Sequence, residues 1–422
     1  MSPPMRPQKI PFGEFVALMA TMTALIALSI DMTLPALPAI AATLGVRRAN
    51  DSQLIVSLLF LGFGFGQFFY GPISESVGRK PAVYVGLALF SAGCLLALVA
   101  RSFSMMLAGR VLQGVGVGGP RAMTIALVRD RFEGRAMARV MSLVMAVFIL
   151  VPVIAPSIGQ VILAIAGWRM IFVVYLTLGL MVWIWFAWRQ EETLAPERRL
   201  PMSIGNIARG AREIVTNRLA VGYTLAAGLV YGAFIGYLSS VQQILQVQYA
   251  LGPKFPLYFA TLAVALGGAS LCNARLVGRY GMRPLAGAAL KLVFAISVVF
   301  LVVVASRAGH PPLLMLIAYL LASFFGIGLL FGNLNALAMQ PLGHIAGIGA
   351  AVVGGSSTLI SLACGTVIGQ SYDNTVLPLV TGFAVLSALA MGVIRFAEHA
   401  GSRMKIADVA TAVEARKGAH ES

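Results

Sequence analysis

The chain has 422 residues, of which 59% are hydrophobic and only 11% are Asp, Glu, Lys or Arg. Soluble domains carry about 25% charged residues, so this composition cannot cover a globular surface with polar groups. A mean hydropathy of +0.88 together with a net charge of +16 excludes a soluble globular protein and indicates an integral membrane protein.

Apolar runs of about 20 residues follow one another along the chain, each long enough to cross about 30 Å of hydrocarbon as a helix. Backbone polar groups in lipid must bond within their own segment, so these runs predict helices rather than open strands. We therefore expect an all-α integral membrane protein with twelve transmembrane helices. The predicted spans are 14–40, 53–74, 81–100, 103–128, 139–165, 168–188, 219–246, 255–277, 284–306, 312–339, 344–368 and 376–396.

A single long polar stretch, 189–218, interrupts this series at its middle. Six spans precede it and six follow it, which predicts two six-helix bundles joined by a linker. The expected organisation is an N-terminal tail (1–13), an N-terminal bundle (14–188), a linker (189–218), a C-terminal bundle (219–396) and a C-terminal tail (397–422).

Lys and Arg residues predict the orientation of the chain in the membrane. If both termini and the linker face the cytoplasm, the inside loops and tails hold 22 of the 31 Lys and Arg residues, and the outside loops hold six. Such an excess is typical of cytoplasmic loops. Because these charges flank apolar spans, we expect anionic lipid headgroups as partners on the cytoplasmic side and no nucleic acid.

An internal repeat supports the division into halves. Aligning Gly78 with Gly281 places Pro81 on Pro284, at an offset of 203 residues. Both segments join the second span of a half to the third through a short, basic turn that contains glycine. Transporters built from repeated halves place a binding site at the interface between the bundles and alternate its access.

Residues that hold metals or catalyse reactions are sparse. Three cysteines fall singly in different spans, and the four histidines are scattered, so we expect no cofactor, no metal, no disulfide framework and no enzyme activity. Those residues are Cys94, Cys272 and Cys364, and His310, His344, His399 and His420.

Asp31 is the one acidic residue deep inside a predicted span. A charged carboxyl at this depth is costly and by default marks a functional site. Binding a proton removes that cost, and a coupled antiporter must bind and release a proton. Arg110 lies at a similar depth, about 12 Å from the outer end of the fourth span. We expect the two to pair when Asp31 is ionised and to separate when it is protonated; a purely structural carboxyl is the alternative.

Arg121 lies eleven residues after Arg110 and therefore on nearly the same face of the fourth span. Two interpretations stand. The guanidinium either binds an anionic group of a substrate and extends a positive track inward, or it pairs with Asp130 or with a backbone carbonyl.

Two segments carry a family resemblance. The turn Gly71-x-x-x-Glu75-x-x-Gly78-Arg79-Lys80 resembles the loop motif G-x-x-x-D-R-x-G-R-R/K of the major facilitator superfamily, with Glu75 in place of Asp and Ser76 in place of Arg. In the fourth span, Arg110-x-x-Gln113-Gly114-x-Gly116 resembles the superfamily segment R-x-x-Q-G-x-G. The resemblance implies the two-bundle fold predicted above.

Two further segments resemble narrower groups of the superfamily. Pro152, Pro156 and Gly159 in the fifth span resemble the proline and glycine motif of its drug:proton antiporter branch. The segment from Asp31 to Pro38 is similar to the D-x-x-L-P-A-L-P of the bicyclomycin/chloramphenicol-resistance (Bcr/CflA) subfamily. This implies a multidrug efflux transporter of a bacterial inner membrane, which exports small amphipathic drugs of the phenicol or bicyclomycin type in exchange for protons.

The resemblance also implies roles for individual residues. A cytoplasmic gate is expected at Gly71, Glu75, Gly78 and Arg79, where Glu75 and Arg79 have i,i+4 spacing if the helix continues. Pro152, Pro156 and Gly159 are expected to bend the fifth span or to let it pack closely. Spans one, four, seven and ten are expected to line a cavity, where the candidate substrate-binding residues are Asp31, Arg121, Tyr231, Phe324, Asn333 and Asn335, with Tyr223, Gln242 and Gln243 as further candidates.

Other functions remain open at this point. A proton-coupled importer of a sugar or another metabolite would use the same fold in the opposite direction. A channel would conduct without proton dependence, and a membrane enzyme would need clustered polar residues that the sequence does not group.

Overall fold

The computed structural model describes residues 10–199 and 204–418. Twelve of its helices are long and apolar enough to cross a membrane, as the sequence predicts. The helices are α1 (Phe12–Asp31), α2 (Leu37–Thr43), α3 (Leu54–Val77), α4 (Arg79–Leu98), α5 (Phe103–Arg131), α6 (Gly134–Ala166), α7 (Trp168–Arg189), α8 (Ile204–Thr216), α9 (Arg218–Gln242), α10 (Phe255–Tyr280), α11 (Met282–Ser306), α12 (Leu313–Met339), α13 (Ala346–Gln370) and α14 (Leu377–Gly418).

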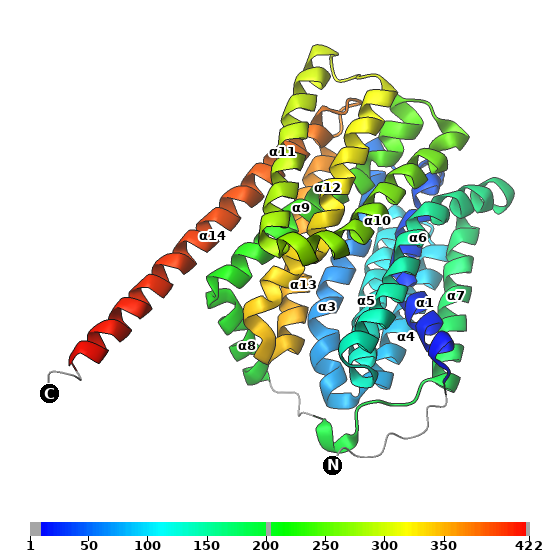
Figure 1. Ribbon diagram of the computed structural model, residues 1–422. Coiled ribbons are helices and arrows are strands. Elements are labelled where there is room, and N and C mark those ends of the chain that lie inside the picture. Colours follow the sequence, from blue (N-terminus) through cyan, green and yellow to red (C-terminus); the bar gives the residue numbers. More distant parts are fainter. Residues whose placement is uncertain (1–9, 200–203, 419–422) are drawn as a thin grey trace.

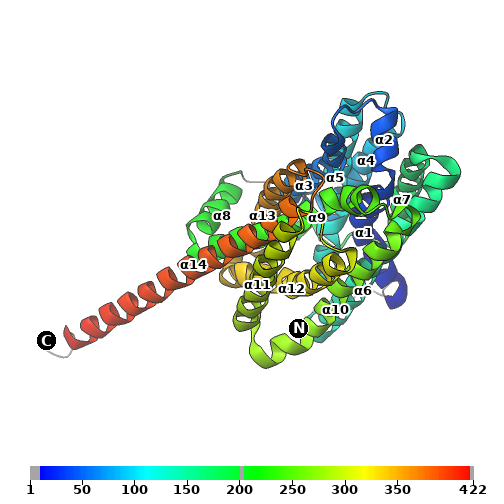
Figure 2. The same ribbon diagram turned by 90° about the horizontal axis from the view of Figure 1, so that it is seen from above.

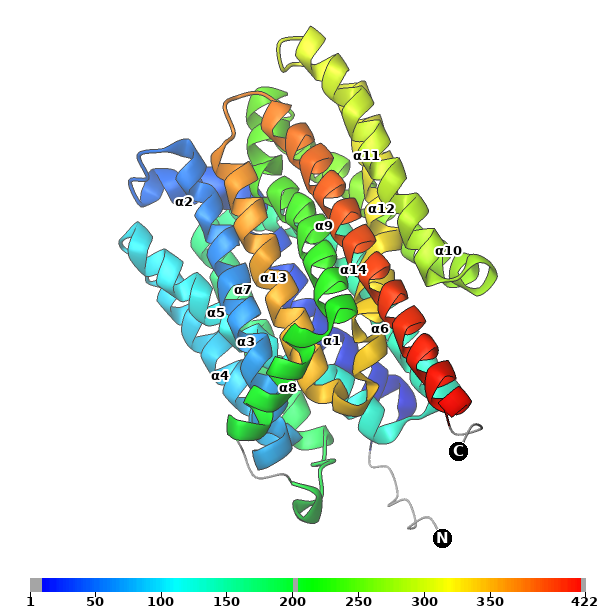
Figure 3. The ribbon, with the colours of Figure 1, turned by 90° about the vertical axis from the view of Figure 1, so that its left-hand side faces the viewer.

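Helices α1–α7 form one bundle and α9–α14 the other, side by side (Figures 1 and 2). Between the bundles α3 packs against α13, and α6 packs against α10. Figure 3 shows α3 and α13 next to each other although they come from opposite halves of the chain. This interface creates the space in which a site shared by both halves can lie.

The first span is broken, whereas the sequence predicts one run over 14–40. Helix α1 ends at Asp31, a short 3-10 turn covers Leu34–Ala36, and α2 begins at Leu37. Pro35 and Pro38 lack the backbone N–H that would continue the hydrogen-bond ladder across this segment. The break therefore places Asp31 at a helix end in the middle of the protein.

Both repeat glycines adopt the backbone conformation that their turns require. Gly78 has φ +112° between α3 and α4, and Gly281 has φ +80° between α10 and α11. Side chains rarely tolerate a positive φ, whereas glycine adopts it freely. The two halves therefore share the turn geometry that the sequence repeat predicts.

The linker and the C-terminus contain more helix than expected. Within the linker, α8 packs Gly210 against Ile348 of α13, and Glu213 lies 2.6 Å from His344. Helix α14 continues to Gly418, so the expected tail 397–422 is helical up to that residue (Figure 1). Of the expected N-terminal tail 1–13, residues 1–9 lie outside the described residues, as do 200–203 in the linker and 419–422 at the end.

Large apolar side chains cover the outer surface, as expected for helices that face lipid. Trp188 is 84% exposed and Leu314 is 81% exposed. Inside the N-terminal bundle the helices approach each other through glycine. A Cβ atom on Gly114 would lie 2.0 Å from the Leu59 carbonyl oxygen, so only glycine allows α5 to contact α3 this closely.

Candidate functional site

A cavity of about 350 Å³ lies between the two bundles, in the half of the protein that carries the linker. Its walls come from α3, α5, α12 and α13, with one pair of helices from each bundle. The lining includes Gln67, Gly71, Glu75, Arg121, Arg129, Asn335, Met339, Gly347 and Gly354. A cavity at the interface of repeated halves is where a transporter binds its substrate.

Arg121 supplies an unused donor to this cavity. Its Nη1 atom is buried and has no hydrogen-bond partner among the described residues, and the guanidinium carbon lies 5.2 Å from the centre of the Phe148 ring. The alternative pairing with Asp130 is not formed, because Asp130 accepts a hydrogen bond from Arg79 instead. A buried donor without a partner is costly, so this guanidinium is poised to bind an acceptor that enters the cavity.

Of the candidates on α12, the cavity is lined by Asn335. Its amide donates to the Tyr231 hydroxyl at 2.9 Å, and Tyr231 in turn donates to the Phe331 carbonyl oxygen at 2.5 Å. Tyr231 thus holds Asn335 in place. Asn333 points elsewhere, because its amide donates to Asn273 of α10 at 2.7 Å. The structure therefore separates two asparagines that the sequence places together, since residues two apart on a helix face different sides.

Phe324 lies in an aromatic cluster of the C-terminal bundle. Its ring centre is 4.6 Å from that of Tyr237 and 5.6 Å from that of Phe234, and it is not among the residues that line the cavity. Phe324 therefore packs beside Tyr237 rather than forming the cavity wall.

Asp31 is buried, with 4% of its surface exposed, at the break in the first span. No hydrogen bond or ion pair to its side chain is present among residues 10–199 and 204–418. The Tyr237 hydroxyl of α9 is likewise buried without a hydrogen-bond partner in the described chain. The N-terminal bundle thus holds a buried carboxyl and the C-terminal bundle a buried hydroxyl, each without a hydrogen-bond partner in the described chain.

Arg110 is not paired with Asp31 in this structure, so the expected pairing with the ionised carboxyl stays a prediction. The fully buried guanidinium donates to the carbonyl oxygens of Ile55 (2.9 Å) and Ser29 (2.8 Å) and to the side chain of Gln113 (2.8 Å). These three neutral acceptors occupy the fork of the guanidinium. Equal depth in the membrane does not specify the direction in which a side chain points. Arg110 instead connects the backbones of α1 and α3 through its hydrogen bonds.

The proline and glycine segment of α6 packs directly behind Asp31. A Cβ atom on Gly159 would lie 2.1 Å from the carbonyl oxygen of Met32, the residue that follows Asp31. Pro152 and Pro156 lie within the same helix, which runs unbroken from Gly134 to Ala166. Gly159 therefore lets α6 pack closely against the first span, as the sequence allowed. Its contact is the backbone of Met32, next to the buried carboxyl of Asp31.

The turn between α3 and α4 is held by acidic residues of other segments. Because α3 ends at Val77, the expected i,i+4 pair of Glu75 and Arg79 is not formed; Arg79 lies 3.1 Å from Asp130 at the end of α5. Glu192 of the linker accepts hydrogen bonds from the backbone N–H groups of Arg79 and Lys80 at 2.9 and 3.0 Å. These carboxylates fasten the turn to its own bundle and to the linker.

Glu75 reaches across to the opposite bundle. Its Oε1 atom lies 2.6 Å from the position that a Cβ atom on Gly347 would take, in the first turn of α13. A carboxylate near a helix N-terminus is stabilised by the unpaired N–H groups and the helix dipole. Gly71, one turn earlier on α3, lies 3.7 Å from Ala351 by the same measure. Glu75 and Gly71 thus join the bundles at the linker end.

Amide side chains join the bundles at the opposite end, a contact that the sequence does not predict. Asn50 donates to the carbonyl oxygens of Gln370 (3.0 Å) and Tyr372 (2.8 Å) and accepts from Gln243 (3.0 Å), while Gln53 donates to Gln243. The one sequence signal for this contact is the polar run at 50–53, next to an apolar span. Gln243 thus belongs to this contact rather than to the cavity.

Comparison with known proteins places this architecture in a family. The family model of the Major Facilitator Superfamily matches residues 19–366, which is most of the chain. The chain belongs to this superfamily. It is therefore a membrane transporter rather than an enzyme, and the matched residues include the segments Gly71–Lys80 and Arg110–Gly116.

Superfamily relatives extend over nearly the whole chain. An uncharacterized transporter of Bacillus subtilis, YdgK, is 29% identical over 87% of this chain and 88% of its own length. A bicyclomycin resistance protein homolog of Haemophilus influenzae is 25% identical (86% and 91%), and the multidrug resistance protein MdtL of Salmonella typhi is 28% identical (85% and 90%). These relatives agree with the subfamily resemblance.

A solved structure confirms the superfamily fold. The crystal structure of the human organic anion transporter MFSD10 superposes with a TM-score of 0.63 at 18% sequence identity. It covers 92% of this chain and 100% of the human chain. At this identity the likeness concerns the fold alone.

Proposed function

We propose that the protein exports small amphipathic drugs across a bacterial inner membrane in exchange for protons. The observation that carries this proposal is the environment of Asp31, a buried carboxyl without hydrogen bond or ion pair among the described residues. An uncompensated buried charge costs several kcal/mol, and a bound proton removes that cost. Asp31 is therefore the group that carries the proton.

Alternating access couples this proton to the drug. When the outer contact around Asn50 opens, Asp31 meets water from outside and takes up a proton as the drug leaves. When the bundles close there and the linker end opens, the proton is released inward and a new drug molecule enters the cavity. The contacts at Asn50 and at Glu75 are the two gates. Asn50 joins the segment just before α3 to the end of α13, and Glu75 joins the other end of α3 to the start of α13.

The cavity supports a proposal for the substrate class. Its volume of about 350 Å³ suits a small drug. The Arg121 guanidinium and the Asn335 amide lie on largely apolar walls, which also carry the polar side chains of Gln67, Glu75, Arg79 and Arg129. A few fixed polar groups in an apolar pocket are typical of sites for amphipathic ligands. We infer a substrate of the phenicol or bicyclomycin type that offers a hydrogen-bond acceptor to Arg121.

The orientation follows from charge. The excess of Lys and Arg in the linker and in the loops at its end of the bundles favours a cytoplasmic position for these segments and for both termini. Drug then enters the cavity from the cytoplasm, as export requires.

Export from proteoliposomes with an imposed pH gradient tests the proposal. The wild type is expected to drive a phenicol against its gradient, and Asp31→Asn is expected to bind the drug but to lose uphill transport. Asp373→Asn, the same change in an exposed outer loop, serves as the matched control. Uphill transport by Asp31→Asn would place proton coupling at another residue.

The same assay separates export from metabolite import. If protein that survives reconstitution moves no drug under a working pH gradient, the proton-coupled importer becomes the better proposal. Uptake of a sugar or another metabolite driven by the same gradient would then establish it.

A further inference from the structure

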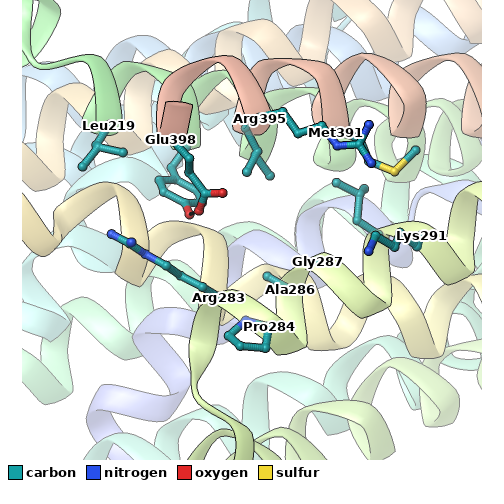
Figure 4. Close-up of a pocket in the computed structure, with 12 residues that line it drawn as sticks. Leu219, Arg283, Pro284, Ala286, Gly287, Lys291, Met391, Arg395 and Glu398 are labelled. Carbon is teal, nitrogen blue, oxygen red and sulfur yellow. Dashed lines mark hydrogen bonds between the residues drawn. The ribbon is translucent and has the colours of Figure 1, made fainter. Parts of the chain in front are cut away.

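A second hollow, of about 560 Å³, lies away from the interface between the bundles. It is formed by α9, α11 and α14 of the C-terminal bundle, at the ends of these helices that lie near the linker (Figure 4). Its lining comprises Leu219, Tyr223, Arg283, Pro284, Ala286, Gly287, Leu290, Lys291, Met391, Ile394, Arg395 and Glu398. Alternating access uses none of these residues.

Cationic side chains dominate this hollow. Arg283, Lys291 and Arg395 line it together with a single carboxylate, that of Glu398. Glu398 accepts a hydrogen bond from the Tyr223 hydroxyl at 2.5 Å, which fixes the carboxylate at one side of the hollow. Figure 4 shows Arg283 and Lys291 on one wall and Arg395 on the facing wall. The hollow therefore carries an excess of two positive charges.

Helix geometry builds this arrangement. Arg283, Gly287 and Lys291 are spaced four residues apart on α11, so they lie on one face of the helix. Gly287 lies between the two cations, and a Cβ atom added to it would have nothing within 4 Å. Because it has no side chain, Gly287 leaves the space between Arg283 and Lys291 open.

Exposed apolar neighbours indicate that the hollow borders the bilayer. Leu292, next to Lys291, is 45% exposed, and Phe396, next to Arg395, is 75% exposed. Lys291 lies about 13 Å from the start of α11, at a depth where a lysine extends its amine toward the interface. The cations therefore lie where lipid headgroups and acyl chains meet.

The corresponding helices of the N-terminal bundle arrange their charges differently. There Glu14 of α1 accepts two hydrogen bonds from Arg189 of α7, both at 2.5 Å, and the amine of Lys80 in α4 donates to the Ala187 carbonyl oxygen at 3.0 Å. Internal partners thus satisfy Arg189 and Lys80. In the C-terminal bundle three cations share a hollow with one carboxylate, which calls for an external anion.

We propose that this hollow binds the phosphate of an anionic phospholipid, with Arg283, Lys291 and Arg395 around the headgroup and the acyl chains beside Leu292 and Phe396. Basic hollows between membrane helices near the cytoplasmic face suit such headgroups. The choice of the cytoplasmic leaflet rests on the orientation proposed above, whereas the site itself is independent of the transported substrate.

Native mass spectrometry of the detergent-solubilised full chain, titrated with phosphatidylglycerol or phosphatidylcholine, tests this proposal. The wild type is expected to bind phosphatidylglycerol at least about tenfold more tightly, since two excess charges attract it. Lys291→Gln and Arg395→Gln are each expected to weaken that binding about fivefold, and Lys291→Arg to restore it. Arg275→Gln, an exposed cation of α10 outside the hollow, is the matched control and should bind as the wild type does.

A variant that fills the hollow without removing a charge separates loss of the binding site from loss of charge. Gly287→Leu retains every charge, fits the open space and fills the hollow, so it is expected to abolish the preference for phosphatidylglycerol. Equal binding of both lipids by the wild type, or unchanged binding by Gly287→Leu, would overturn the proposal. Inorganic phosphate distinguishes the source of the anion: if it saturates the hollow at concentrations where phosphatidylglycerol does not bind, the ligand is a soluble anion and the lipid assignment is wrong.

Discussion

Gly159 offers a direct test of the packing around Asp31. In Gly159→Ala the new Cβ atom would lie 2.1 Å from the Met32 carbonyl oxygen, whereas such contacts are essentially never below 3.0 Å, so the two backbones must separate by at least 0.9 Å. Because the neighbour is backbone rather than a flexible side chain, we expect a loss of about 1–3 kcal/mol in the free energy of unfolding. The displacement occurs beside Asp31, so uphill drug export should fall as well.

Gly268→Ala in α10 is the matched control, because a Cβ atom there would have nothing within 4 Å. It replaces glycine by alanine inside a helix and should stabilise the protein by about 0.5–1 kcal/mol. Thermal unfolding of both variants in detergent, followed by tryptophan fluorescence, measures the difference, and proteoliposome export measures the transport. If Gly159→Ala unfolds at the same temperature as Gly268→Ala, α6 does not press on the broken span and the reasoning fails.

Three further predictions concern Arg110 and the two ends of the interface. Arg110→Gln removes the charged donor that the carbonyl oxygens of Ile55 and Ser29 share, which should cost about 1–3 kcal/mol for each lost hydrogen bond. A melting temperature equal to that of the wild type would contradict this role. Asn50→Ala removes two hydrogen bonds that Asn50 donates and one that it accepts. The fraction of molecules with a long spin-label distance between the outer ends of α3 and α13 should therefore rise roughly tenfold. An unchanged distance distribution would argue against an outer gate. Glu75→Gln weakens the contact with the start of α13. The fraction of molecules with a long distance between spin labels at the linker ends of α3 and α13 should therefore rise about two- to fivefold. A shift toward shorter distances would refute the gate at Glu75.

The sequence by itself determined the architecture. Hydropathy and segment length predicted twelve spans and two halves, because a helix that crosses lipid must be apolar over about 20 residues. The glycines at 78 and 281 predicted matching turns, because their positive φ is a local property of the chain. The break after Asp31 also has a local cause, the prolines Pro35 and Pro38. The apolar run continues across them, so hydropathy alone did not predict the break.

The tertiary structure alone decided which polar groups meet. Depth placed Arg110 beside Asp31, but the direction of its side chain and the nearby carbonyls of Ile55 and Ser29 gave it other partners. The outer contact at Asn50 and the basic hollow around Lys291 each join helices that are far apart in the sequence. Hydropathy reports how deeply a residue lies in the membrane, whereas contact depends on the rotation of each helix and on the packing between helices, which only the folded protein fixes.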